Sequence, residues 1–304
     1  MSSKLLKYLS DSDYRFTINR HLGMHSTMPD DIYLKKIYRA HLSKELDLDS
    51  PKSFNEKLQW LKLHDRNPAY HQMADKSQVK QFVADKIGES YIIPTLGVFD
   101  RFEEIDFDSL PNAFVLKCTH DSGGVVICEN KADFNKDEAK KTIERFLKSD
   151  YYSQWREWPY QGLPHRIIAE EYIGTGKGLT DYKIHCFNGE PKLILVCKDR
   201  FSETGLTEDF FTETWEHLPV RRPDHPNASA SIKKPEQLDE LLRLSRVLAK
   251  SIPFVRIDFY INEGQILFSE ITFFPAAGLS PFIPDKWDII FGDMLDISKV
   301  DSLD

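Results

Sequence analysis

Short turns join several apolar segments of this chain into pairs, and this feature limits the possible folds more than any other. Segments 181–187 and 190–197 flank Asn188-Gly189, the strongest short signal for a β-hairpin. A second pair of apolar segments surrounds Asn262-Glu263-Gly264. Strands do not alternate regularly with helices along the chain, which disfavours a doubly wound parallel sheet. The pattern predicts an α+β fold in which the strands are grouped as hairpins.

Helical patterns fill the first ninety residues and recur between the strands. Ser53 and Glu56 have the spacing of a capping box at the start of an amphipathic run. Further helices with one apolar side are expected around 139–147 and 238–248, whereas the polar segment 200–234 is typical of a long loop. We therefore expect helices packed around the hairpins.

Composition excludes several classes of function. The chain has 304 residues, enough for two or three packed lobes, and 40 Lys and Arg against 48 Asp and Glu give a net charge of −8. This balance argues against a dedicated nucleic-acid-binding protein. No apolar run approaches the roughly 20 residues that cross a membrane, and the N-terminus lacks the hydrophobic stretch of a signal peptide. The four cysteines form no Cys-x-x-Cys pair, so we expect buried, reduced thiols and a cytoplasmic protein.

The last hairpin carries the most informative charged residues. Arg256 and Asp258 share one face of their strand, because side chains alternate between faces, and the other face is apolar. We expect a three-residue loop, Asn262-Glu263-Gly264, to close the hairpin. This loop places Arg256 opposite Glu270 and Asp258 diagonal to Glu270, with Thr272 continuing the same face.

Two carboxylates this close repel each other unless a cation compensates them. Carboxylate oxygens suit Mg²⁺, which keeps several waters and shares the phosphates of a substrate. An exposed face with a simple Arg–Glu pair is the alternative, and the hairpin alone favours neither. A two-residue Glu-Gly turn would instead put the two acids on opposite faces.

A lysine and a glycine-rich loop form the second candidate. Lys117 points away from the apolar face of its strand, which leads into Ser122-Gly123-Gly124. Such a loop lets backbone N–H groups approach a phosphate closely. It is not a Walker loop, because no Gly-Lys-Ser/Thr follows. An ordinary glycine turn is the alternative.

Three further groups are weaker candidates. The strand 166–173 ends in Glu170-Glu171-Tyr172-Ile173, which could offer backbone groups to a purine and a carboxylate to its amine or ribose. Asp181 and Lys183 share a face, with an exposed ion pair as the alternative. The aromatic residues Trp155, Trp158 and Tyr160 are expected to pack at a boundary between lobes, with stacking on a sugar as the alternative.

In chain order these elements resemble the ATP-grasp fold, and more closely the TupA-like ATP-grasp family, named for a protein of teichuronopeptide synthesis. Seven blocks in the family's order, between about residues 30 and 280, carry the resemblance: SFNEKLQWLK, ADKSQVKQFVADKIGESYIIP, FVLKCTHDSGG, IIAEEYI, DYKIHCFNGEPK, RIDFY and SEITFFPAAG. The resemblance implies two α+β lobes with antiparallel sheets that clasp ATP. It divides the chain into a helical N-terminal region and start of the first lobe (1–90), a small lobe with a Gly-rich lid (91–165), and a C-terminal lobe with hinge and Mg²⁺ site (166–304).

The resemblance also implies roles for single residues. The α- and β-phosphates of ATP would bind Lys76 and Lys117, and the β- and γ-phosphates the lid backbone of Ser122-Gly123-Gly124. The hinge residues Glu170, Glu171, Tyr172 and Ile173 would bind adenine and ribose. The remaining nucleotide contacts would come from Lys80, Asp181 and Lys183.

The last hairpin would supply the metal site and the catalytic cation. Asp258 and Glu270 would hold Mg²⁺, and Arg256 would neutralise an acyl phosphate, with Lys117 as the second catalytic residue. Thr272 stands where many ATP-grasp enzymes have Asn, and it offers one oxygen. Asp121 lies in the lid, where a glycine or neutral residue is expected. It is given no binding role, because a carboxylate there would repel triphosphate unless it pointed outward. We expect Asp258→Asn or Glu270→Gln to abolish turnover and leave the fold intact.

The implied activity is an ADP-forming carboxylate–amine ligase that uses ATP and Mg²⁺. The resemblance indicates a hexuronic acid of a capsular or cell-wall polysaccharide, or its nucleotide-linked precursor, as the carboxylate substrate, and an amino acid or other amine as the second substrate. Exposed arginines such as Arg200, Arg221 and Arg222 could attract such an anionic sugar. The alternatives are a polysaccharide glycosyltransferase, whose Asp-x-Asp-like motif is not found, an ATP-grasp kinase, and a non-catalytic ATP-binding protein.

Overall fold

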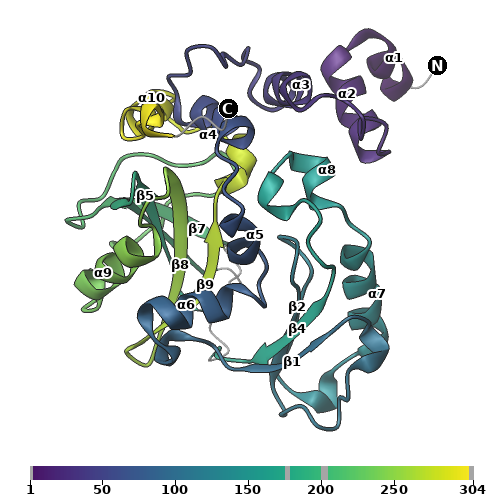
Figure 1. Ribbon diagram of the computed structural model, residues 1–304, viewed down its shortest axis with the longest axis vertical. Helices are drawn as coiled ribbons and strands as arrows, with labels where there is room; N and C mark the ends of the chain where they lie inside the picture. Colours follow the sequence, from purple (N-terminus) through teal and green to yellow (C-terminus); the bar gives the residue numbers. More distant parts are fainter. Residues whose placement is uncertain (1–2, 175–178, 200–204, 301–304) are drawn as a thin grey trace.

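Two antiparallel sheets form the frame of the protein in the computed structural model, which describes residues 3–174, 179–199 and 205–300 (Figure 1). The smaller sheet has the order β1-β4-β2-β3 and the larger sheet the order β7-β6-β5-β8-β9. All neighbouring strands in both sheets are antiparallel, so the expected hairpin-based α+β fold is confirmed. The strands are β1 (Thr95–Phe99), β2 (Phe114–Cys118), β3 (Val125–Cys128), β4 (Ile167–Glu171), β5 (Asp181–Phe187), β6 (Glu190–Lys198), β7 (Thr207–Thr212), β8 (Phe254–Asn262) and β9 (Gln265–Thr272).

Helices cover the outer sides of both sheets. α7 runs along the outer side of the smaller sheet and α9 along that of the larger sheet, so the inner faces turn toward each other (Figure 1). Helices α1 to α3 lie beyond α8 at one end of the molecule (Figure 1). The helices are α1 (Ser3–Ser10), α2 (Ser12–His21), α3 (Asp30–Leu42), α4 (Phe54–His64), α5 (Ala69–Ala74), α6 (Val79–Ile87), α7 (Lys136–Leu147), α8 (Tyr151–Trp155), α9 (Leu238–Leu248) and α10 (Lys286–Asp293).

Two large apolar cores hold the helices to the sheets. The larger core joins α4, α6, α9 and α10 to the larger sheet, with Ile184, Ile257 and Phe259 fully buried. The smaller core joins α7 to the smaller sheet. α4 begins with the expected capping box: the Glu56 amide donates to Ser53 Oγ (3.2 Å), and the Ser53 amide donates to Glu56 Oε2 (2.9 Å). Because the outer faces pack against helices, the polar side chains of the strands are left to the inner faces.

Two local expectations were wrong. The segment 200–234 is not a continuous loop, because β7 lies within it and pairs with β6. The polar residues Thr207, Glu208 and Asp209 are typical of a loop in the sequence, but they belong to this strand and their side chains are buried. The other error is the closure of the last hairpin, which is a two-residue turn of Glu263-Gly264 with φ of +49° and +84°.

The predicted parts of the chain are interleaved in space. The strand β4, which the sequence division at 165 and 166 groups with the C-terminal lobe, pairs with β1 and β2 in the smaller sheet. The division itself stays a prediction. The glycine-rich segment after β4 continues into residues 175–178, which lie outside the described residues. All four cysteines are free and buried, as expected. None of the helices in the described part of the chain has the length and apolar character needed to cross a membrane.

Candidate functional site

A buried arginine joins the polar side chains of the last hairpin. Arg256 Nε donates to Asp258 Oδ1 and Arg256 Nη2 to Asp258 Oδ2, both at 2.7 Å. Arg256 Nη2 also lies 3.0 Å from Glu270 Oε1 and 3.0 Å from Thr272 Oγ1. Asp258 is fully buried, whereas the Glu270 side chain is 35% exposed. The four residues therefore form one network, with Glu270 at its open side.

A β-bulge keeps the two acids on the same face. The two-residue turn would pair Asp258 with Ser269 and turn Glu270 away, but the register shifts by one residue between Asp258 and Phe259. Asp258 is therefore directly opposite Glu270, rather than diagonal to it, and Arg256 is opposite Thr272. The extra residue in β9 corrects for the short turn, as a bulge does when two residues oppose one.

Lys183 of β5 extends the network to a third strand. Its Nζ lies 2.5 Å from Asp258 Oδ2 and 3.7 Å from Asp181 Oδ2, and Asp181 itself is buried. Burial by itself would raise the pKa of Asp258, but Arg256 and Lys183 outweigh burial and lower it. Burial likewise opposes the charge on Lys183, yet Asp258 raises its pKa. The Asp258 carboxylate is thus ionised and held by two cations, so the alternative of an exposed ion pair is wrong for Lys183.

Two lysines hold Glu170 on the inner face of the smaller sheet. Lys117 Nζ lies 2.6 Å from Glu170 Oε2, and Lys80 of α6 contacts Glu170 Oε1. Lys80 also donates to the carbonyl of Ile93 at 2.6 Å. Burial works against the charge on Lys117, but Glu170 overcomes it, with smaller contributions from Tyr260 and Glu270, so the pKa of Lys117 is raised. Glu270 of the larger sheet thus favours the charge on Lys117 of the smaller sheet.

The β2–β3 loop contains a buried aspartate. Asp121 is 2% exposed, and its Oδ1 accepts hydrogen bonds from the amides of Gly123 (3.3 Å) and Gly124 (3.2 Å). Lys76 donates to the backbone carbonyl of Asp121. The Asp121 carboxylate therefore lies within the loop rather than pointing out of it. Its carboxylate occupies the two amides that were expected to meet a phosphate, because a buried backbone N–H needs an acceptor.

The other hinge residues lie apart from the buried charges. Glu171 is exposed, and its amide donates to the carbonyl of Pro94 at 3.1 Å. The Tyr172 hydroxyl donates to Glu129 Oε1 at 2.6 Å. Tyr172 and Ile173 are both half-buried. Of the four hinge residues, the structure thus brings only Glu170 into direct contact with Lys80 and Lys117.

Sequence reasoning missed a buried acid next to this region. Glu157 is 1% exposed and lies between α8 and the turn Trp158–Tyr160. Arg256 lies close enough to lower its pKa, although burial dominates and raises that pKa to about 8. The only sequence signal was a charged residue inside an aromatic stretch. Trp158 itself packs in the larger core, as expected for a boundary between lobes.

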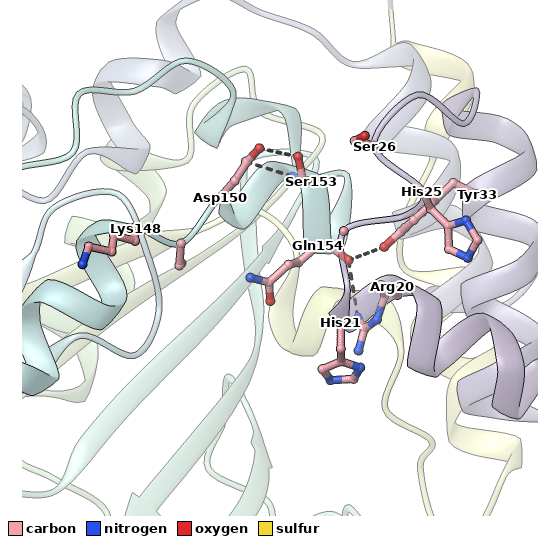
Figure 2. A pocket seen from close by; sticks show the side chains of 11 residues that line it. Arg20, His21, His25, Ser26, Tyr33, Lys148, Asp150, Ser153 and Gln154 are labelled. Atoms are coloured by element: carbon pink, nitrogen blue, oxygen red, sulfur yellow. Dashed lines mark hydrogen bonds between the residues drawn. The ribbon is translucent and has the colours of Figure 1, made fainter. Parts of the chain in front are cut away.

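A separate cavity lies between the N-terminal helices and α8 (Figure 2). Its volume is about 400 Å³, and none of the predicted site residues lines it. Arg20 and Tyr33 both donate to the carbonyl of Gln154 there, at 3.4 and 2.8 Å (Figure 2). The cavity therefore belongs to the packing of α8 against the N-terminal helices rather than to the charged region between the sheets.

The donor groups of the last hairpin fit a magnesium ion that is shared with a substrate. No cluster of three or more His, Cys, Asp or Glu suited to a metal occurs among the described residues. Mg²⁺ needs fewer protein ligands than this, because one or two carboxylates with waters and substrate phosphates complete its shell. Glu270 is partly exposed and stands beside Thr272 Oγ1 at 3.3 Å. Asp258, held by two cations, would chiefly add negative charge.

The structure combines two antiparallel sheets that face each other with a Gly-rich loop between β2 and β3, a Lys–Glu pair and an Arg/Asp/Glu hairpin. This combination is typical of the ATP-grasp class of proteins. The sequence model of the TupA-like ATPgrasp family matches residues 56–296. The chain belongs to the TupA-like ATP-grasp family, and the expected family and fold are confirmed. No curated protein matches the chain.

Several solved structures have a similar fold. A D-alanine–D-alanine ligase from Bacillus anthracis, complexed with ATP, is 16% identical, with a TM-score of 0.38 over 66% of this chain and 53% of that one. The D-alanine–D-alanine ligase from Helicobacter pylori is 12% identical, with a TM-score of 0.45 over 83% and 70%. N5-carboxyaminoimidazole synthetase from Staphylococcus aureus is 14% identical, with a TM-score of 0.39 over 66% and 44%. The chain spans about half the length of the first of these structures.

Proposed function

We propose that the protein is an ADP-forming ligase that joins an amine to the carboxylate of a hexuronic acid. The observation that carries this proposal is the buried guanidinium of Arg256, held by Asp258 and Glu270 on a face turned toward Lys117. A fixed cation beside carboxylates can neutralise the negative charge that develops during phosphoryl and acyl transfer. Cytoplasmic ATP would supply the phosphoryl group.

The nucleotide would lie between the two sheets. Lys76 and Lys117 provide positive charge for the α- and β-phosphates. Glu170 already contacts Lys80 and Lys117, so we assign it the task of holding these lysines rather than binding adenine. Adenine and ribose would then meet Glu171, Tyr172 and Ile173, with Asp181 and Lys183 at the adjoining edge of the larger sheet.

The loop Ser122-Gly123-Gly124 would close over the β- and γ-phosphates. Its two glycine amides now donate to Asp121, so phosphate oxygens would have to replace that carboxylate as acceptors. Mg²⁺ would be held chiefly by Glu270, with Thr272 offering an oxygen and Asp258 adding negative charge, and it would neutralise phosphate charge when bound.

The reaction would proceed in two steps. A carboxylate oxygen of the uronic acid attacks the γ-phosphorus of ATP, the bond to the β-phosphate oxygen breaks, and an acyl phosphate and ADP form. The amine nitrogen then attacks the acyl carbon, the carbon–oxygen bond to phosphate breaks, and an amide and inorganic phosphate form. Arg256 would bind the acyl phosphate, since positioning and charge neutralisation dominate this chemistry.

The choice of sugar rests on the resemblance to the TupA-like family rather than on contacts. The resemblance indicates an acidic polysaccharide, or its nucleotide-linked precursor, as the carboxylate substrate. Arg221 is exposed and Arg222 is half-buried near Phe282, and both could meet an anionic sugar. Arg200 lies outside the described residues.

The test is incubation of the protein with MgATP, glucuronic or galacturonic acid, and pooled amino acids. We expect phosphate release that requires MgATP, the uronic acid and an amino acid together. We also expect a product whose mass equals uronic acid plus amine less water. Lys117→Met should lose at least tenfold in rate. Lys192→Met, which removes an exposed strand lysine, should not change it. A phosphorylated sugar without amide would identify a kinase instead, and ATP binding without hydrolysis a non-catalytic binding protein.

A further inference from the structure

The segment from α8 to residue 160 presents two neighbouring charged residues to different surroundings. Arg156 has a left-handed backbone, with φ of +53°. Its side chain turns to the N-terminal helices, where Arg156 Nε lies 3.1 Å from Asp30 Oδ1 and Arg156 Nη2 donates to the carbonyl of His25 at 2.7 Å. Glu157 lies instead near Arg256, on the side of the candidate site. A strained backbone position thus directs the acid toward the site.

The segment is fixed on the larger lobe. Trp158 Nε1 donates to the carbonyl of Asp65 at 2.8 Å, and His71 Nδ1 lies 2.9 Å from the carbonyl of Pro159. Trp158 is also part of the larger core. Glu157 is therefore held in one place by its neighbours in sequence rather than by bonds of its own carboxylate.

The carboxylate of Glu157 is incompletely satisfied. Its Oε1 is buried and has no hydrogen-bond partner among the described residues. The nearby buried cation, Lys62, donates to Gln59 Oε1 (3.0 Å) and to the carbonyls of Trp155 (2.9 Å) and Ala277 (2.9 Å), so its three protons are already engaged. A buried carboxylate oxygen without a donor is costly, and such a group often marks a functional site.

Two tyrosines connect Glu157 to the candidate site. The rings of Tyr151 and Tyr160 lie 4.7 Å apart. Burial raises the pKa of Tyr151, with smaller contributions from Glu157 and Glu270, and Tyr151 in turn lowers the pKa of Glu157. The surroundings of Tyr160 likewise include Glu157 and Glu270. Glu157 therefore adjoins the Arg256 and Glu270 end of the site, where an acyl phosphate would form.

We propose that Glu157, Tyr151 and Tyr160 form the subsite for the amine substrate. This inference rests on the ligase function proposed above. A primary ammonium offers the hydrogen-bond donors that Glu157 Oε1 lacks. The nearby rings of Tyr151 and Tyr160 add a favourable cation–π environment, whereas an anionic substrate would be repelled.

Glu157 would also take the first proton from the amine. The bound ammonium favours the ionised form of the Glu157 carboxylate, as a neighbouring cation does. Its nitrogen transfers one proton to that carboxylate and becomes a neutral nucleophile. Its electron pair forms the C–N bond, and the bond between the acyl carbon and the phosphate oxygen breaks. The second nitrogen proton goes to the departing phosphate, which leaves as HPO₄²⁻. The products are the amide, phosphate and a protonated Glu157.

The test measures amine binding separately from nucleotide binding. The full-length protein is saturated with MgAMP-PNP and titrated calorimetrically with ethanolamine, L-alanine and L-lysine in turn. We expect at least one amine to bind, Glu157→Gln to weaken it at least tenfold, and Glu157→Asp to restore part of the affinity. AMP-PNP affinity should be unchanged in both Glu157 variants.

A matched pair of tyrosines controls for disturbance of α8. Tyr151→Phe removes the hydroxyl near Glu157 and should change amine affinity. This variant still tests the subsite if Glu157→Gln fails to fold. Tyr152→Phe removes the neighbouring hydroxyl, which donates to Asp30 (3.0 Å) instead, and should not change it. Equal amine affinity in the wild type, Glu157→Gln and Tyr151→Phe would overturn the inference, as would no amine binding to the nucleotide complex. Failure of AMP-PNP itself to bind would overturn the proposed ligase and the subsite with it.

Discussion

At the scale of single residues, the two acids of the last hairpin differ in a way that their sequence positions conceal. Asp258 is completely buried between Arg256 and Lys183, whereas a third of the Glu270 side chain is exposed. A buried acid that holds two cations contributes to the fold as well as to chemistry. A partly exposed acid contributes little to stability.

Asp258→Asn should therefore lower both activity and stability, contrary to the sequence expectation of an intact fold. Removing one member of a buried ion pair costs about 3–5 kcal/mol. Glu270→Gln should instead cost less than about 1 kcal/mol of unfolding free energy and reduce turnover on the order of 100-fold or more. Chemical denaturation and the phosphate-release assay measure the two effects, with exposed Glu263→Gln as control. Equal stability losses for both variants would contradict the assignment.

Asp121 is a residue whose position could not be predicted from the sequence. A carboxylate in a phosphate-binding loop would repel triphosphate unless it pointed outward, so no role was given to it. In the structure it is buried and accepts from the two glycine amides. The reason is local, because a loop of buried N–H groups needs an acceptor and the carboxylate is the nearest one.

At the scale of elements, the β2–β3 loop depends on glycines that are crowded to different degrees. A Cβ on Gly124 would lie 2.6 Å from Cys118 Sγ and 2.8 Å from Phe146 Cβ, atoms close to the backbone. A Cβ on Gly123 would meet the outer ring of Phe146, 2.6 Å from Cε1. The ring can move aside, but the atoms around Gly124 cannot do so without displacing β2 or α7.

Gly124→Ala should thus displace the loop and weaken ATP binding more than Gly123→Ala does. Overpacking typically costs about 1–3 kcal/mol, which for Gly124→Ala would appear as weaker MgATP binding in calorimetry. Gly123→Ala serves as the matched control. Replacing the ring with Phe146→Val should relieve the clash of Gly123→Ala. Equal ATP affinities for the two alanine variants would argue against the loop as a phosphate-binding element.

At the scale of the whole molecule, two buried ionisable groups lie where the N-terminal helices meet the lobes. Burial raises the pKa of Glu157 to about 8 and lowers the pKa of Lys62 to about 8. The folded protein therefore binds more protons at Glu157 than the unfolded chain between the usual value of 4.5 and about pH 8. At Lys62 it binds fewer protons between about pH 8 and the usual value of 10.5.

These two shifts predict a stability minimum near pH 8. The contribution of Glu157 is full below pH 4.5 and is lost as pH rises to about 8, whereas that of Lys62 grows as pH rises further toward 10.5. Glu157→Gln should remove the decline on the acidic side, so its Tm should change less than that of the wild type between pH 5 and 8. Melting curves at fixed ionic strength measure this. An unchanged slope in the variant would show that Glu157 titrates normally.

Much of the fold and several parts of the site could be predicted from the sequence. Alternating apolar residues predicted the antiparallel hairpins, and the Ser53–Glu56 spacing predicted the start of α4, because these signals act over a few residues. The shared face of Arg256 and Asp258 followed from the same two-residue period. β7 was missed because its polar residues are buried only by the surrounding tertiary structure.

Only the tertiary structure decided the details on which the chemistry depends. The bulge in β9 brought Glu270 opposite Asp258 despite the short turn, and the packing of α8 brought Glu157 toward Arg256. Local sequence determined which side chains share a face of a strand, since backbone geometry repeats over short distances. Register, burial and the meeting of the two sheets depend on contacts between residues far apart in the chain, which local patterns do not encode.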